Sequence, residues 1–197
     1  MEDGYSFFAL ISRLKYVTRW ALMRNSDIEN VREHSHMVAV IAHALAVIRR
    51  DVFKRDADPG EAAIAALYHD APEIFTGDMP TPVKYHNDAI TAAYREVEAV
   101  AAERLSDALP PELRGAFAPY FDGADAGTEE LVKAADKLAA YIKCLEELGA
   151  GNREFSLAAR QTRAKLDALH MAEVEYFIER FIPAFEHTLD QQLTIDN

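Results

Sequence analysis

The sequence predicts an all-α fold. Apolar residues recur at intervals of three and four along most of the chain, and almost no stretch alternates apolar and polar residues as a β-strand does. Capping residues and prolines divide this pattern into segments of helical length. Since no low-complexity tract or internal repeat interrupts the pattern, we expect a bundle of about seven to nine helices in a single domain spanning residues 1–197.

The first two predicted helices flank a loop. Residues 5–17 place several apolar side chains on one helix face: Phe7, Leu10, Ile11 and Leu14. The polar stretch TRWALMRNSDIE (18–29) then indicates a loop. Asn30, followed three positions later by Glu33, is typical of a capping box and predicts a helix over residues 31–50.

The third predicted helix begins at Asp58 and Pro59, because proline is tolerated at the first helical position, where its missing N–H has no intrahelical partner. It ends at His69 and Asp70. Pro72 disfavours α geometry at the preceding residue, so a kink or break is expected here. The apolar residues that we expect this helix to carry are Ile64, Leu67 and Tyr68.

A long fourth helix is predicted to end at Pro110, followed by a short helix over residues 111–121 and a glycine-containing loop. Thr128 is predicted to cap the next helix, which stops at Gly149. The stripe of the long helix is Ile90, Tyr94, Val97, Ala101 and Leu105, and that of the next is Leu131, Ala135, Leu138, Ile142, Leu145 and Leu148. The last two helices are expected at 153–169 and 171–190, the second bent at Pro183.

Composition limits the classes of function. Of 197 residues, 50% are hydrophobic and 27% charged, which suits one compact domain with a sizeable core. The formal charge of -12 argues against binding to nucleic-acid polymers or anionic membranes. Cys144 cannot form an internal disulfide, and its apolar neighbours indicate a buried, reduced thiol. The acidic N-terminus predicts no signal peptide and no apolar run is long enough to span a bilayer, so we expect a cytoplasmic protein.

Four residues stand out as potential metal ligands: His34, His69, Asp70 and Asp136. Each lies in or at the end of a predicted helix and interrupts or borders an apolar stripe. A carboxylate beside a core stripe, such as Asp136, costs several kcal/mol if it is buried without a partner or a metal. Two imidazoles and two carboxylates suit a divalent first-row ion, and an incomplete coordination shell would favour catalysis over a purely structural role.

Other interpretations of these residues stay open. An adjacent His-Asp pair also occurs by chance, so the motif alone is only a hypothesis. Asp136 could instead be a surface acid that pairs with Lys133 and Lys137. We interpret His36 and His43 as structural, because no other residue supports a role in a site.

Four segments carry a resemblance to a known family: EHS (33–35), YHDAPE (68–73), TGDMPTPVK (76–84) and KAADKLAAYIKCLEEL (133–148). In this order they resemble the HD-domain metal-dependent phosphohydrolase superfamily, and within it the bacterial 5′-deoxynucleotidases. The segment SRLKYVTRWALMRN (12–25) is also similar to that family. The H…HD…D pattern is common to the superfamily, whereas Arg-Trp with TGD-x-PTP is more specific.

The resemblance implies an HD-type fold and hydrolysis of deoxyribonucleoside 5′-monophosphates with broad base tolerance. It implies one divalent metal, such as Co, Mn or Zn, with Glu73 as the proton-transfer residue and Arg19 as a further catalytic group. It also implies a homodimer. The implied metal ligands are His34, His69, Asp70 and Asp136, and the implied substrate contacts are Arg19, Trp20, His34, Asp70, Asp78, Met79, Pro80, Thr81 and Asp136.

The residue types suit this chemistry. Arg19 can bind phosphate oxygens in a bidentate manner, and Glu73, four positions after His69, can reach the metal-binding groups and transfer a proton. Trp20 is expected to exclude a ribose 2′-hydroxyl. An acid at Asp78 makes sense as an acceptor for a sugar hydroxyl or as a partner for a nearby cation. Structural alternatives are a solvated Arg19 at a helix end and Glu73 as a helix-start acid.

Two other functions remain possible from the sequence. One is hydrolysis of a cyclic nucleotide or a nucleoside triphosphate by the same kind of site, which would call for additional basic groups. The other is a non-catalytic helical module stabilised by a metal. A purely structural site has no use for Glu73 or for the pair Arg19-Trp20, which disfavours the second alternative.

Overall fold

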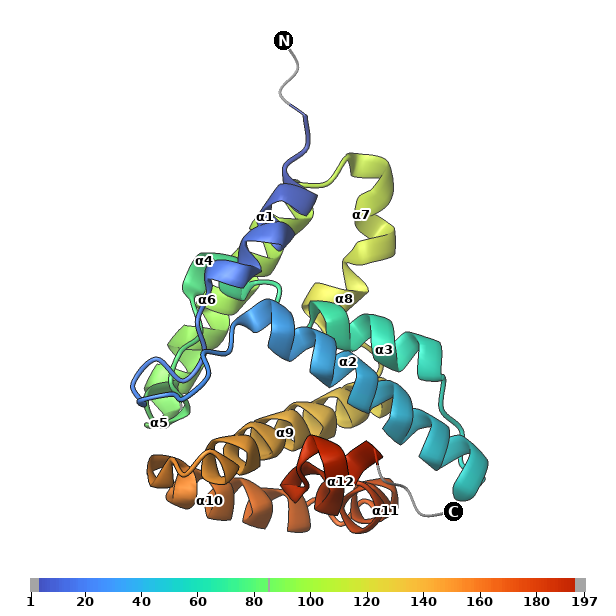
Figure 1. Ribbon diagram of the computed structural model, residues 1–197. Coiled ribbons are helices and arrows are strands. Elements are labelled where there is room, and N and C mark those ends of the chain that lie inside the picture. Colours follow the sequence, from blue (N-terminus) through green and yellow to red (C-terminus); the bar gives the residue numbers. More distant parts are fainter. Residues whose placement is uncertain (1–3, 85, 194–197) are drawn as a thin grey trace.

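The computed structural model describes residues 4–84 and 86–193, and this part of the chain is all-α, as predicted (Figure 1). The described residues form more helices than the seven to nine expected, because segments near Pro72, Pro80 and Pro119 fold as separate four-residue helices and a further short helix lies near the C-terminus. The helices are α1 (Phe7–Arg13), α2 (Val31–Val47), α3 (Pro59–Tyr68), α4 (Glu73–Thr76), α5 (Thr81–Lys84), α6 (Asp88–Asp107), α7 (Pro111–Phe117), α8 (Pro119–Asp122), α9 (Ala126–Gly149), α10 (Ser156–Asp167), α11 (Ala172–Arg180) and α12 (Leu189–Leu193).

Helices α2, α3 and α9 form the main core. Figure 1 shows α2 and α3 together on one side of α9. The face of α3 that packs inward consists of small residues, Ala62, Ala65 and Ala66, which allow a close approach to α2. Ile64 and Leu67, which the predicted helix was expected to carry, lie on α3 and are 41% and 45% exposed.

The other side of α9 is covered by α10 and by the C-terminal segments (Figure 1). The predicted helix 171–190 does not continue to its expected end. It stops at Arg180 and is followed by a 3₁₀ turn, Ile182–Glu186, because Pro183 cannot donate the backbone hydrogen bond that a continuing helix requires. Ile182 and Phe177 complete the core on this side.

Caps define the helix starts. The Asn30 side chain accepts a hydrogen bond from the Glu33 N–H, which confirms the predicted cap of α2. The predicted cap of α9 at Thr128 was wrong. Asp125 caps this helix instead by accepting hydrogen bonds from the N–H groups of Gly127 and Thr128, since a carboxylate three positions earlier satisfies the same orphan donors.

A second, smaller core joins α1 to the chain after α3. The buried members of this core are Phe7, Ala71, Leu105 and Leu109. Ala71, which follows His69 and Asp70, thus packs against α1 and the end of α6. Val97 of α6 was expected in the same stripe as Tyr94 and Ala101, but it is 50% exposed, whereas these two residues on either side of it are buried. Across the described ranges, the structure contains no helix whose length and apolar character would allow it to cross a membrane.

Candidate metal centre

The end of α3 fixes the position of the first imidazole. His69 directly follows the last helical residue, and Pro72 prevents the helix from continuing, as predicted. The His69 Nδ1 atom lies 2.7 Å from the backbone carbonyl oxygen of Ala66. Because a carbonyl only accepts, Nδ1 carries a proton, and Nε2, the nitrogen that a metal would bind, faces the other ligand candidates.

The second imidazole comes from the first turn of α2 and the second carboxylate from the middle of α9. His34 is fully buried, and its Nε2 atom lies 3.0 Å from Asp136 Oδ1 and 3.7 Å from Asp70 Oδ2. The two imidazole rings are 5.6 Å apart between centroids. Asp70 Oδ2 also lies 3.1 Å from His69 Nε2. Three helices far apart in the sequence thus bring their polar groups to one point.

This arrangement fits a divalent cation. His34, His69 and Asp136 each offer one ligand atom, and these atoms lie within 4.8 Å of one another. His69 Nε2 is buried, and among the described residues no group forms a hydrogen bond with it, because the nearby Asp70 Oδ2 does not meet the geometry of one. The Asp136 side chain is 39% exposed, so the centre opens toward solvent on one side. A nitrogen and oxygen donor set with an open side suits a first-row ion that also binds a substrate.

The electrostatics of the cluster also favour a cation. Burial lowers the pKa of His69, but the Asp70 carboxylate outweighs this effect and raises the pKa to about 9. Burial raises the pKa of Asp70, but His69 more than offsets it, so the pKa stays well below its usual range. Asp136 has a lowered pKa for a similar reason: burial raises the pKa, and the hydrogen bond to His34 lowers it more. The two carboxylates therefore remain ionised and attract positive charge.

Glu73 begins α4 and is protonated at neutral pH. Burial is the main cause that raises the pKa of its carboxyl group, and the charges of Asp70 and Asp78 raise it further, to about 9. Its Oε2 atom is buried and has no hydrogen-bond partner within the described part of the chain. A neutral, half-buried carboxylic acid next to ionised carboxylates is a suitable proton donor.

Arg19 lies beside the cluster and remains charged. Its Nη1 atom is 3.5 Å from Asp70 Oδ2 and 4.0 Å from Asp78 Oδ1, while its Nε atom donates to Glu29 at 3.1 Å. Burial lowers the pKa of the guanidinium, but the surrounding carboxylates raise it above its usual value. The alternative of a solvated Arg19 does not hold, because its side chain is only 12% exposed.

Trp20 adopts a rare backbone conformation. Its φ is 56°, in the left-handed region that costs a residue with a side chain roughly 1–2 kcal/mol. The indole N–H donates to Glu29 Oε2 at 3.1 Å, and the centroids of the Trp20 and Phe155 rings are 5.3 Å apart. These contacts fix the side chain beside Arg19.

The segment after α4 turns at Gly77, whose φ of 71° lies in the left-handed region that favours glycine. Asp78 follows on the side of Arg19, and Met79 and Pro80 are partly buried. The side chain of Thr81 lies outside the described part of the structure.

Glu29 is a residue of the site that the sequence interpretation missed. It lies in the predicted loop, outside every motif, and its contacts depend on how that loop folds. Of the other histidines considered, His36 and His43 are exposed on α2, away from the cluster. Asp136 lies 3.0 Å from His34 Nε2, so the alternative of a surface acid that only pairs with Lys133 and Lys137 does not hold.

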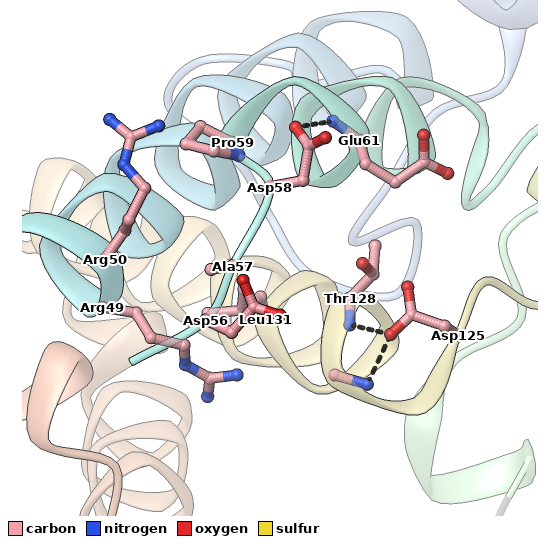
Figure 2. A pocket seen from close by; sticks show the side chains of 11 residues that line it. Arg49, Arg50, Asp56, Ala57, Asp58, Pro59, Glu61, Asp125, Thr128 and Leu131 are labelled. Atoms are coloured by element: carbon pink, nitrogen blue, oxygen red, sulfur yellow. Dashed lines mark hydrogen bonds between the residues drawn. The ribbon is translucent and has the colours of Figure 1, made fainter. Parts of the chain in front are cut away.

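A cavity of about 580 Å³ lies elsewhere, beside the start of α9 (Figure 2). Several of its polar groups are already engaged: Asp58 accepts from the Glu61 N–H and Asp125 from the Thr128 N–H, as the dashed lines show. Arg49, which also lines this cavity, forms an ion pair with Glu130 at 2.7 Å. These groups serve as helix caps and ion-pair partners, so we place the candidate site at the His/Asp cluster.

Solved structures share this fold. An HD-domain phosphohydrolase from Listeria innocua matches with a TM-score of 0.78 and 22% identity, over 91% of this chain and 88% of that one. The cyanophage S-2L HD phosphohydrolase DatZ, solved with dA and one catalytic Zn²⁺ ion, matches with a TM-score of 0.62 and 23% identity, over 89% and 95%. This chain thus has the fold of the HD-domain phosphohydrolases.

The sequence comparisons are more specific. The family described as 5′-deoxynucleotidase YfbR-like matches residues 6–185. The 5′-deoxynucleotidase YfbR of Escherichia coli is 50% identical over 187 residues, which is 94% of each chain. The chain therefore belongs to the 5′-deoxynucleotidase YfbR-like family, as the resemblance indicated.

Proposed function

We propose that this protein is a metal-dependent 5′-deoxynucleotidase that hydrolyses deoxyribonucleoside 5′-monophosphates to a deoxyribonucleoside and phosphate. The observation that carries the proposal is the position of Arg19, whose Nη1 atom lies 3.5 Å from Asp70 in the His/Asp cluster. A phosphate clamp and a cation site are thus adjacent. The 50% identity to a protein named for this activity supports the same substrate class.

The proposed ligands of one divalent ion are His34, His69, Asp70 and Asp136. A bound ion would neutralise phosphate charge, polarise a phosphoryl oxygen and lower the pKa of a bound water. The Zn²⁺ of DatZ favours zinc, and the same donors suit cobalt or manganese. His69 is pre-oriented for this task by the Ala66 carbonyl, so little reorganisation accompanies binding.

Arg19 binds the phosphate of the substrate. Its Nε atom is held by Glu29, and its Nη atoms, of which Nη1 also lies near Asp70, can bind phosphoryl oxygens. In phosphoryl transfer, charge stabilisation and positioning supply most of the catalysis, so a fixed guanidinium next to the cluster provides both.

Glu73 protonates the leaving group. As water attacks phosphorus, the bond from phosphorus to O5′ breaks, and the neutral Glu73 carboxyl delivers its proton to O5′. A cation bound at Asp70 would remove part of the repulsion that raises the pKa of Glu73, but burial, the larger cause, remains. The carboxyl group regains a proton from the attacking water or from solvent.

Trp20 and the segment 78–81 are proposed to contact the sugar. The fixed indole leaves no room or partner for a 2′-hydroxyl, and Asp78 is placed to accept from a sugar hydroxyl or to orient Arg19. No set of side chains suited to reading a base was found in the sequence, so several bases are tolerated.

Triphosphates and cyclic nucleotides are the alternative substrates. Besides Arg19, the cations that could bind additional phosphates are already engaged: Lys84 pairs with Glu98 at 2.6 Å, Arg24 lies 3.6 Å from Glu154, and Lys137 donates to the Lys133 carbonyl at 3.0 Å. We further propose a single domain over residues 1–197, a cytoplasmic location and a homodimer, on the basis of the family.

The test is a substrate panel. Parent protein and Glu73→Gln are assayed for product release from deoxy- and ribonucleoside monophosphates, triphosphates and cyclic nucleotides, with added Zn²⁺, Mn²⁺ or Co²⁺. The proposal predicts turnover of deoxyribonucleoside monophosphates by the parent and a loss of about 10²–10⁴-fold in Glu73→Gln. Glu103→Gln, an exposed acid on α6, serves as the control. Faster turnover of a triphosphate or cyclic nucleotide would contradict the proposal and favour that substrate class. If no substrate is turned over, the alternative of a non-catalytic, metal-stabilised module is favoured.

A further inference from the structure

One atom of Glu29 connects the two proposed substrate-binding residues. Its Oε2 atom accepts hydrogen bonds from Arg19 Nε and from Trp20 Nε1, both at 3.1 Å. The Arg19 and Glu29 side chains are only 12% and 16% exposed. Hydrogen bonds to a shielded carboxylate are stronger than those between neutral groups, so this atom holds both donors in defined orientations.

The contact with Glu29 determines which edge of the Arg19 guanidinium is available to bind phosphate. Three carboxylates surround the guanidinium, and Glu29 makes the closest contact, at 3.1 Å, compared with 3.5 Å for Asp70 and 4.0 Å for Asp78. Glu29 binds Nε, whereas the other two lie near Nη1. Without Glu29, the guanidinium would be free to rotate onto Asp70, a proposed metal ligand, and phosphate would lose its oriented partner.

The contact with Glu29 also supports the unusual backbone of Trp20. A left-handed tryptophan persists only where its surroundings fix it. The backbone of this loop is closed by the Arg19 N–H, which donates to the Glu29 carbonyl at 3.0 Å, and by the bridge between Thr18 and Asn30. The indole N–H bond to Glu29 then fixes the side chain on this backbone.

The loop itself is anchored by other residues. The Glu147 carboxylate accepts from the backbone N–H groups of Ser26 and Asp27, and Lys143 Nζ donates to the Asp27 carbonyl. Glu154 accepts from the Arg24 N–H at 3.1 Å. The Glu29 side chain is therefore not required to hold the loop against α9, and its contacts serve the orientation of Arg19 and Trp20.

Glu29 faces the metal cluster on its other side. Its Oε1 atom lies 3.9 Å from His34 Nδ1, a buried nitrogen that has no hydrogen-bond partner among the residues the structure describes. At this distance the carboxylate acts electrostatically and favours the imidazole orientation in which Nε2 faces Asp136.

We propose that Glu29 is a positioning residue that couples phosphate recognition by Arg19 to sugar recognition by Trp20. Selectivity for deoxyribonucleotides then depends on a residue that does not touch the substrate. This inference rests on the proposed function, in which Arg19 and Trp20 contact the nucleotide.

The test uses the fact that Trp20 is the single tryptophan of the chain, so its fluorescence reports on the indole directly. The variants are Glu29→Ala, Glu29→Gln and the control Glu154→Gln, which alters a contact to the same loop. Emission spectra are recorded for each, with kcat and KM for dAMP and AMP. Thermal melts show whether each variant is folded, and Glu29→Gln, which preserves side-chain shape, carries the test if Glu29→Ala does not fold.

In Glu29→Ala we expect emission at longer wavelength, a KM for dAMP raised about tenfold or more, and a lower ratio of kcat/KM for dAMP over AMP. Glu29→Gln retains an acceptor oxygen but loses the ion pair, so its emission stays near that of the parent while its KM rises. Glu154→Gln resembles the parent in all three measurements.

Unchanged emission in folded Glu29→Ala would overturn the positioning role. A changed emission together with a parental KM and selectivity would overturn the proposed effect of Glu29 on substrate recognition. If the parent hydrolyses neither nucleotide, the proposed function fails, and the emission comparison alone upholds or overturns the positioning of Trp20 by Glu29.

Discussion

Replacing Glu147 by glutamine removes the charge at the centre of a buried polar cluster. The Glu147 carboxylate accepts hydrogen bonds from Lys143 Nζ at 2.6 Å and from Asn152 Nδ2 at 2.7 Å. It also accepts from the backbone N–H groups of Ser26, at 2.8 Å, and Asp27, at 3.2 Å. The cluster attaches the loop that carries Arg19 and Trp20 to α9, so its free energy contributes to the stability of the site.

The size of this contribution follows from the pKa. Burial raises the pKa of Glu147, but the hydrogen bonds from Lys143, Asn152 and the loop backbone outweigh it and lower the pKa from 4.5 to about 2. A shift of about 2.5 pKa units corresponds to about 3 kcal/mol of stability. Because the folded pKa is below the unfolded value, this stability is fully present above pH 4.5 and is lost as the pH falls toward 2.

Urea unfolding at several pH values measures this contribution. At pH 7 we expect Glu147→Gln to be about 3 kcal/mol less stable than the parent, and we expect the difference to narrow below pH 4.5. Glu129→Gln is the control on the same helix. Its ion pair with Lys133 is exposed, so we expect a loss below about 1 kcal/mol. An equal loss in both variants, or a difference in the free energy of unfolding that does not change with pH, would refute this reasoning.

Two further predictions concern Trp20 and Cys144. Trp20→Ala should lower the preference for deoxy- over ribonucleotides in paired kcat/KM measurements, because the indole no longer excludes the 2′-hydroxyl; an unchanged preference would contradict this role. Burial raises the pKa of the Cys144 thiol to about 12, so only about one thiol in 10⁴ is ionised at pH 8. A disulfide reagent should therefore modify the folded protein at least about 100-fold more slowly than the urea-unfolded chain, and equal rates would show that the thiol is accessible.

Local signals in the sequence were sufficient where a few neighbouring residues decide the structure. Asn30 and Asp58 cap their helices as predicted, and Pro72 ends the helix before it, because each effect acts within one turn. The cap of α9 was misassigned because Asp125 and Thr128 both suit the position, and only the folded backbone shows which of them accepts the N–H groups.

Packing decides which apolar residues are buried. Ile64 and Leu67 are large apolar residues of α3, but α3 approaches α2 through alanines, and helix spacing cannot be read from hydrophobicity alone. Val97 was expected in a continuous stripe along α6, but it is exposed between the buried Tyr94 and Ala101.

The candidate site likewise contains residues that the sequence identified and one residue that it did not. His34, His69, Asp70 and Asp136 were identified from residue type and the family pattern, and the structure brings them close to one another. Glu29 could not be identified in this way, because an acid in a loop has no periodicity or motif. Its role depends on the left-handed turn at Trp20, which places the Arg19 and Trp20 side chains against one carboxylate.

The central claim is that one divalent ion is bound between His34, His69, Asp70 and Asp136. Anomalous diffraction from a crystal soaked in Zn²⁺ or Mn²⁺ tests it most directly. We predict one strong peak at about 2.0–2.2 Å from His34 Nε2, His69 Nε2 and Asp136 Oδ1, with Asp70 also in contact. A map without a peak at this position, with Asp136 turned toward solvent, would contradict the assignment of the metal centre.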